Sequence, residues 1–391
     1  MRLWPRSDGA IAALLSAAAA LLYEITGIGR PTSFDYYGRL ADALLHGRWW
    51  LVTAPSQLIE LVPCGADRYC VAYPPMPAIL AIPFVVVFDA STAQTLASGI
   101  AGGLSAGPTY LAMRALDVPN RIALVVTIFG VAGTTLWFTA STGDAWFFAH
   151  AVAVLFASLA VLGALRGWPA WSIGALIGAA ALARLPIALA LPALALVARE
   201  RRGGSLVACL GGALIGVIPF VVLELAYNEM RWGAPSEAGY TYLTVDNPAA
   251  PYGLFDLRYL PDHLFAILAR PPELGDAPFL IRPSRWGMSL LLLSPAYVLL
   301  VPAARELRAR PVIMGLFLAG ALALLPDLFH GGVGARQLGY RFSLDAQPFW
   351  LPLVAVGATE AARPRLFVAL VLWSVLANAY GTIAIATVGY A

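Results

Sequence analysis

The chain has 391 residues, of which 60% are hydrophobic and only 12% are charged, and its formal net charge at pH 7 is +3. Soluble domains carry roughly 25% charged residues, so this composition excludes an ordinary soluble fold and predicts an all-α protein that crosses a membrane several times. The small net charge does not indicate a nucleic-acid partner.

The first apolar segment follows Arg2 and Arg6 and is not followed by a small-residue cleavage pattern, so we expect an uncleaved first membrane helix. A membrane helix needs about 20 apolar residues. On this basis the sequence predicts about eleven spans, at residues 9–28, 92–114, 121–140, 145–165, 169–183, 186–199, 204–226, 286–304, 311–327, 347–362 and 365–386.

Arginines cluster in the short loops on one side of this arrangement, and all 25 basic residues of the chain are arginine. The positive-inside rule places this side in the cytoplasm, so the N-terminus is expected inside and the C-terminus outside. The clusters are Arg2 and Arg6, Arg114 and Arg121, Arg166, Arg199 with Arg201 and Arg202, Arg305 with Arg308 and Arg310, and Arg363 with Arg365.

The segment from Pro74 to Phe88 is apolar but short and proline-rich. If it crossed the membrane, every later arginine cluster would face outward, so we predict a helix lying at the outer interface. The outer segments are then a first loop at 29–91, a short turn near 141–144, a large loop at 227–285 and a last segment at 326–347. We expect an N-terminal module, 1–202, and a C-terminal set of helices, 203–391.

Asp35 lies just outside the first span, within Ser33-Phe34-Asp35-Tyr36-Tyr37-Gly38-Arg39. A carboxylate at this place suits a general base that takes a proton from an acceptor hydroxyl. The alternative is a helix N-cap, a position that aspartate favours. Tyr36 and Arg39 are candidate substrate-binding residues, because sugar sites favour aromatic and polar side chains.

Asp144 and His150 flank the second outer turn. Asp144 is a candidate second carboxylate that orients a substrate, and the alternative is a solvated turn. His150 is a candidate substrate-binding residue. Six residues apart on a helix, the pair does not share a face well, and a metal site needs more ligands than these two. We therefore predict no metal and no cofactor.

Arg184 and Arg341 are candidate ligands for a phosphate. Arg184 lies in an apolar hairpin, and ionisable residues at such depth are costly and usually functional. A guanidinium can hold a phosphate through two hydrogen bonds, although Arg184 could also snorkel to the interface. Arg341 follows Tyr340, a candidate substrate-binding residue, and an internal Arg341–Asp345 pair is the alternative for this second arginine.

Cys64 and Cys70 bracket a tight loop in the outer compartment, which is oxidising in bacteria. A disulfide between them is the prediction, and two free thiols are the alternative. Cys209 lies within an apolar span, where it is expected only to pack.

Together, these N-terminal features resemble the GT-C superfamily of glycosyltransferases, above all its protein-mannosyltransferase-like and aminoarabinose-transferase-like branch. They are Asp35 after the first helix, the long outer loop, a Pro-Pro helix and Asp144 in the second outer turn, and they cover residues 11–202. Tyr73-Pro74-Pro75 stands where the family has a basic residue or histidine before Pro-Pro. Tyr36 stands where many members have glutamate. Tyr73 is thus a further candidate substrate-binding residue.

The resemblance implies an inverting enzyme in the bacterial inner membrane, with its active site on the extracytoplasmic side. The donor would be a sugar on a polyprenyl phosphate, drawn from among the membrane lipids, and the acceptor a glycan, a lipid or a protein. Asp35 matches the family's base and Asp144 its second acidic position. The alternatives are a transporter or lipid flippase, and a non-catalytic scaffold with the same fold. The carboxylates gather on the outer side rather than along a path through both leaflets, which argues against transport.

Overall fold

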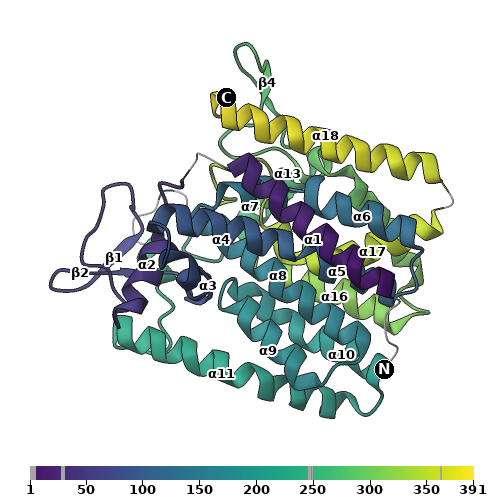
Figure 1. Cartoon of the computed structure of the whole chain (residues 1–391), viewed down its shortest axis with the longest axis horizontal. Helices are drawn as coiled ribbons and strands as arrows, with labels where there is room; N and C mark the ends of the chain where they lie inside the picture. The colour runs from purple at the N-terminus through teal and green to yellow at the C-terminus, as the bar shows by residue number, and fades with distance from the viewer. Residues whose placement is uncertain (1–5, 28–30, 245–247, 249, 362) are drawn as a thin grey trace.

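The computed structural model describes residues 6–27, 31–244, 248, 250–361 and 363–391. Three sequence predictions fall outside the described residues. They are the end of the first predicted span at 28, the end of another predicted span at 362, and Arg2, which is predicted on the cytoplasmic side. The chain forms a helical bundle with two small hairpins of strands (Figure 1). Helices suit a lipid environment because they satisfy the hydrogen-bonding groups of their own backbone.

The N-terminal half begins with α1, which packs against α4 and α5. The bounds are α1 (Arg6–Gly27), α2 (Tyr36–Leu45), β1 (Leu61–Gly65), β2 (Arg68–Val71), α3 (Met76–Val85), α4 (Ala90–Leu104), α5 (Ala106–Ala115), α6 (Asn120–Ala132), α7 (Leu136–Thr142), α8 (Ala145–Arg166), α9 (Ala170–Ala181), η1 (Leu185–Ala190) and α10 (Leu191–Arg202).

The C-terminal half packs on α8 and α10 through α17 and α16. Its elements are α11 (Leu206–Trp232), α12 (Tyr240–Thr244), η2 (Leu257–Tyr259), α13 (Leu260–Leu268), β3 (Glu273–Leu274), β4 (Ile281–Arg282), α14 (Leu290–Leu293), η3 (Pro295–Leu299), α15 (Leu300–Ala303), η4 (Ala304–Glu306), α16 (Pro311–Leu324), η5 (Pro326–Phe329), α17 (Ser343–Glu360) and α18 (Pro364–Val388). The predicted boundary at 202 and 203 stays a prediction.

Two long apolar helices lie at opposite edges of the bundle, α11 against α9 and α18 beside α6 (Figure 1). The approach of α11 to α9 depends on glycine. A Cβ added at Gly174 or Gly216 would lie 1.8 Å from a backbone oxygen of the facing helix. Small residues let membrane helices approach closely, which replaces the hydrophobic driving force that lipid does not supply.

Five described helices are long and apolar enough to cross a membrane, or seven if each bent pair counts as one span. The helical segment Ala90–Ala115, which comprises α4 and α5, follows α3 after a short break, and the chain bends by 114° there. The helix α3 therefore does not continue the direction of this segment. The predicted single span at 286–304 is instead four short pieces, α14 to η4. Pro295 and Pro302 lie within this segment, and proline lacks the backbone N–H that a continuous helix needs.

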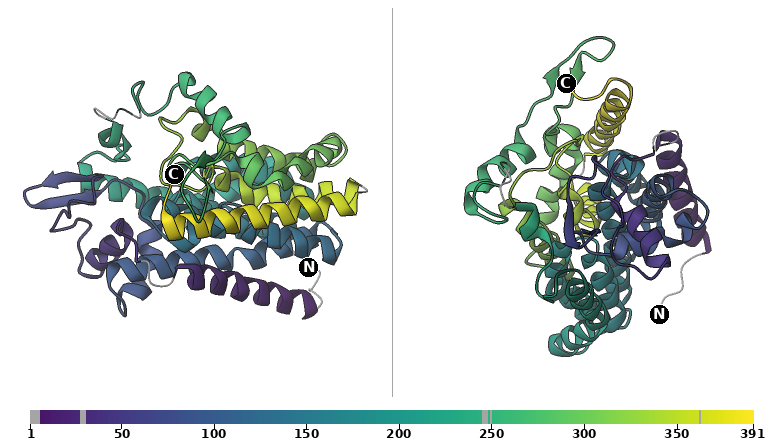
Figure 2. Two further views of the ribbon diagram at one scale, coloured as in Figure 1. Left: turned by 90° about the horizontal axis from the view of Figure 1, so that it is seen from above. Right: turned by 90° about the vertical axis from the view of Figure 1, so that its left-hand side faces the viewer.

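The first loop lies at one end of the bundle, and α1 enters from the other end (Figures 1 and 2). At the first end, α2, α3 and the β1–β2 hairpin gather, and the C-terminal Ala391 N–H donates to Pro283 in the large loop at 3.1 Å. The loops that contribute to the cavities described next therefore meet at this end.

Candidate active site

A cavity of about 260 Å³ lies between the first loop, α8 and the segment before α17. We call it the central cavity. Its walls combine aromatic rings with a glutamate and three arginines. The residues that line it include Tyr37, Glu60, Tyr73, Trp146, Arg184, Tyr240, Trp286, His330, Arg336, Arg341 and Phe342.

Arg184 enters this cavity from the turn between α9 and η1, and it is held by two buried carboxylates. Its Nη2 lies 2.8 Å from Asp345 Oδ2 and 2.9 Å from Asp327 Oδ1. His150 Nδ1 lies 2.9 Å from the other oxygen of Asp345. The positive charge of Arg184 is thus compensated inside the protein, although its side chain keeps 16% of its surface exposed.

Arg341 differs from Arg184, because it forms no ion pair with a carboxylate in the part of the chain that the structure describes. Its Nη1 donates to the Ala335 carbonyl at 3.1 Å, and its guanidinium lies over the rings of Phe147 and Phe342. The expected alternative, an internal Arg341–Asp345 pair, does not form, since Asp345 binds Arg184. Gly334 leaves room for Arg341: a Cβ there would lie 2.7 Å from Nη1.

Glu60 is fixed in the wall of the central cavity by two donors. Its Oε2 accepts hydrogen bonds from the Tyr73 hydroxyl and from Trp146 Nε1, the latter at 2.8 Å. Its backbone N–H donates to the Tyr36 hydroxyl at 3.0 Å. Burial raises the pKa of Glu60 to about 6, although the Trp146 hydrogen bond and the charge of Arg341 lower it. At neutral pH the group is therefore mostly a carboxylate.

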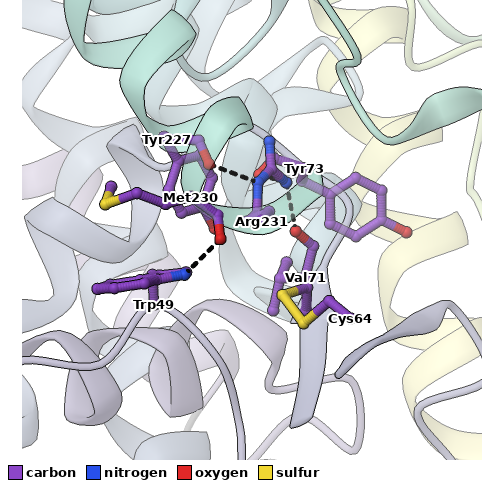
Figure 3. Close-up of a disulfide and its surroundings, with 8 residues drawn as sticks. Trp49, Cys64, Val71, Tyr73, Tyr227, Met230 and Arg231 are labelled. Carbon is purple, nitrogen blue, oxygen red and sulfur yellow. Dashed lines mark hydrogen bonds between the residues drawn. A yellow bond between two sulfur atoms is a disulfide. The ribbon is translucent and has the colours of Figure 1, made fainter. Parts of the chain in front are cut away.

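The β1–β2 hairpin holds Glu60 and Tyr73 together at its base. Leu61 pairs with Val71, so Glu60 and Tyr73 lie just before β1 and just after β2. Cys64 and Cys70 are joined by a disulfide across this hairpin, with a Cα–Cα distance of 5.8 Å. On the other side, Arg231 of α11 donates to the carbonyls of Val71 and Tyr73 (Figure 3).

We expect the disulfide to protect the hairpin against local opening. Closing a loop this short stabilises by about 2 kcal/mol in the chain-entropy description, or about thirtyfold in an opening equilibrium. In a Cys64→Ala/Cys70→Ala variant, amide hydrogen exchange over 61–71 should accelerate by about that factor. Cys209→Ala, which removes the free buried cysteine, is the control. Unchanged exchange in the double variant would show that Arg231 alone holds the hairpin.

Asp35 is buried at the N-cap position of α2, but its side chain makes no capping hydrogen bond. Its Oδ1 instead lies 2.8 Å from Nε of Arg39, whose side chain is 34% exposed. Asp35 lines neither large cavity, whereas its neighbours do: Tyr37 lines the central cavity and Phe34 lines a second one. The segment that carries Asp35 therefore borders both cavities, while the Asp35 side chain itself is paired with Arg39.

This second cavity, of about 370 Å³, is bordered by α18, and we call it the α18 cavity. Asp144 lines it and accepts a hydrogen bond from the Thr32 hydroxyl. Burial raises the pKa of Asp144, and the Thr32 hydrogen bond acts in the opposite direction. Arg336, with a left-handed backbone φ of 54°, lines both cavities and joins them. Such backbone strain in a non-glycine residue is frequent at functional sites.

A glutamine brings the two predicted catalytic carboxylates near the same short segment. Gln94 of α4 is fully buried, and its Oε1 accepts from the backbone N–H groups of Tyr37 and Gly38. Its Nε2 donates to the carbonyls of Phe34 and Gly143. One amide thus ties the start of α2, beside Asp35, to the turn before α8 that carries Asp144.

The other predicted substrate-binding residues are placed differently. Tyr73 lines the central cavity, and Arg39 lines a separate outer groove. Tyr36, His150 and Tyr340 line none of these three cavities. The Tyr36 hydroxyl and His150 Nδ1 bond inside the protein, and the Tyr340 hydroxyl lies 2.8 Å from His263 Nδ1. The structure does not bring these three to the cavity surface.

Glu60, Trp146 and Arg336 are cavity residues that the sequence alone does not single out. Glu60 and Trp146 are 86 residues apart, so no local spacing indicates their contact. The run of glycines around Arg336 was the available signal, because glycine-rich segments often surround ligands. Among the described residues, no group of three or more His, Cys, Asp and Glu side chains is arranged to hold a metal ion.

Solved structures with the same arrangement of helices include ArnT from Cupriavidus metallidurans bound to undecaprenyl phosphate. That alignment covers 97% of this chain and 78% of ArnT, with a TM-score of 0.58 and 14% identity. The apo state of the same protein aligns over the same shares, with a TM-score of 0.54 and 14% identity. No protein-family model matches the chain, and no curated protein matches its sequence. The chain therefore has the fold of these ArnT structures, in agreement with the polytopic helical fold that the sequence predicts.

Proposed function

We propose that this protein is a membrane glycosyltransferase that moves a sugar from a polyprenyl phosphate to an acceptor hydroxyl, with inversion at the sugar carbon. The observation that carries the proposal is Arg341, a buried guanidinium without a carboxylate partner among the described residues, in an aromatic-lined cavity. The similar fold of ArnT, solved with undecaprenyl phosphate, supports a lipid phosphate as the ligand.

Arg341 is the main phosphate ligand in this proposal, and Arg184 contributes beside it. Two hydrogen bonds from a guanidinium match the oxygens of a phosphate, and the charge stays positive at all relevant pH values. The phosphate leaves with the electron pair of the broken sugar–oxygen bond, and a fixed cation stabilises the charge that develops there. Arg184 is already compensated by Asp345 and Asp327, so its contribution is smaller.

Asp35 is the base, as the resemblance implies. It takes the proton of the acceptor hydroxyl while that oxygen bonds to the sugar carbon on the face opposite the leaving phosphate. Its neighbours Phe34 and Tyr37 line the two cavities, which supports this role, because donor and acceptor can then reach this segment from different sides. Arg39, which pairs with Asp35, is partly exposed and can turn away without unpacking the core. Asp144 orients the acceptor in the α18 cavity.

The site faces the extracytoplasmic side of a bacterial inner membrane in this proposal. The first loop contributes Tyr37, Glu60 and Tyr73 to the central cavity and also carries the disulfide, which suits an oxidising compartment. The acceptor is a glycan, a lipid or a protein of the cell envelope.

Purified protein incubated with a panel of undecaprenyl-phosphate pentoses and hexoses, together with an envelope extract, tests the function. Release of undecaprenyl phosphate, with the sugar appearing on an acceptor, is the expected result. Movement of the intact lipid-linked sugar across vesicles without cleavage would replace the proposal with lipid transport.

A further inference from the structure

We propose that Glu60, Tyr73 and Trp146 form a subsite of the central cavity that recognises the sugar of the donor. This inference rests on the proposed function. It adds Glu60 and Trp146, which the N-terminal motifs do not assign to any role, and it places the sugar beside them in the cavity.

The hydrogen bonds around Glu60 leave one oxygen for a ligand. Oε2 is occupied by the Tyr73 hydroxyl and Trp146 Nε1, and Trp146 Nε1 also lies 2.8 Å from the Tyr73 oxygen. Oε1 accepts no hydrogen bond from the described residues, while Glu60 lines the cavity. A carboxylate held by two donors, with its second oxygen available, is prepared to accept from a hydroxyl or an ammonium group.

Aromatic rings surround this carboxylate. The centroid of the Tyr73 ring lies 6.0 Å from that of Tyr37 and 6.2 Å from that of Tyr240, and all three rings line the central cavity together with Trp146. Pockets for small molecules combine apolar walls with a few fixed polar groups that orient the ligand. A sugar presents both kinds of surface, because its C–H groups pack on rings and its hydroxyls donate hydrogen bonds.

The charges of the cavity set the direction of the donor. Glu60 is mostly ionised at neutral pH, and Arg341, whose charge it senses, lines the same cavity. An anionic phosphate is attracted to Arg341 and repelled by Glu60. The hydroxyl hydrogens of the sugar suit a carboxylate, so the sugar lies beside Glu60. The phosphate lies beside Arg341, and the phosphate–sugar bond lies between these two residues.

Binding measurements on Glu60→Gln test the subsite. The probes are sugar-free undecaprenyl phosphate and the undecaprenyl-phosphate pentoses and hexoses. A hydrogen bond to a charged group is worth about ten- to a hundredfold in affinity. We expect Glu60→Gln to lower the affinity for the preferred sugar-bearing lipid by that factor. Its affinity for undecaprenyl phosphate should stay within twofold of the wild-type value. Trp146→Phe, which keeps a ring but removes the N–H, should produce a smaller loss of the same kind.

Glu360→Gln, at an exposed position at the end of α17, is the matched control and should bind both probes normally. Equal weakening of both probes by Glu60→Gln would mean a structural role and would overturn the subsite. Wild-type protein that binds sugar-free and sugar-bearing lipid equally well would overturn it too, while leaving the phosphate site intact. Failure of the wild type to bind undecaprenyl phosphate at all would instead reject the proposed function.

Discussion

Replacing Asp35 with asparagine should lower the turnover rate by about 10²- to 10⁴-fold, the usual cost of losing a general base. A sugar hydroxyl is a weak nucleophile until its proton begins to leave, and asparagine keeps the size of aspartate but cannot accept that proton. The comparison is made on single-turnover rates at saturating donor, so that a change in binding does not enter the result.

The fold should survive this change. Asp35 makes no capping hydrogen bond through its side chain, and asparagine caps helices about as well as aspartate. The ion pair with the partly exposed Arg39 is the interaction that is lost, and such pairs typically contribute at most about 1 kcal/mol.

Asp42→Asn is the matched control, because Asp42 is an exposed carboxylate on the same helix. It should turn over at the wild-type rate. A well-folded Asp35→Asn protein with nearly normal turnover would remove Asp35 from the mechanism and make Asp144, which lines the α18 cavity, the next residue to test.

Arg341→Gln should lower turnover by about 10²- to 10³-fold while leaving the protein folded, since losing one preorganised group that stabilises developing charge typically costs this much. Arg341 has no buried carboxylate that would lose its partner among the described residues, so its removal does not expose an uncompensated charge. Donor affinity should fall as well, because the phosphate loses its main ligand. Undecaprenyl phosphate binding and single-turnover rates measure the two effects separately.

Arg184→Gln should fail in a different way. It leaves Asp345 and Asp327 buried without their cation, and breaking a buried ion pair by removing one partner costs about 3–5 kcal/mol. The expected result is a lower thermal unfolding temperature and a lower yield, measured on detergent-purified protein. Arg258→Gln, which removes an exposed arginine of the loop between α11 and α14, controls for the loss of a positive charge.

If the Arg341→Gln protein binds and turns over the donor normally, the phosphate site lies elsewhere.

Local and additive properties of the sequence were sufficient to predict the membrane class and the predominance of helices, whereas the fold was predicted from the resemblance of the N-terminal motifs to a known family. Hydropathy sums over neighbouring residues, so most long spans could be predicted, and Cys64 and Cys70 are close enough in the chain to indicate their bond. The predicted span at 286–304 is not one continuous helix: α14 ends at Leu293, with Ser294 as its C-cap directly before Pro295, and short 3-10 and α-helical pieces follow.

The partners of the charged side chains were decided only by the tertiary structure. Asp345 lies four positions after Arg341, a spacing that brings two side chains together when both lie on one helix. However, α17 begins at Ser343, so Arg341 precedes the helix and points into the central cavity region, while Asp345 meets Arg184 from 161 positions away. Glu60, likewise, contacts Trp146 only because the disulfide-bonded hairpin lies next to the start of α8. Such contacts depend on how helices pack across the whole bundle, and the sequence near each residue carries no record of that packing.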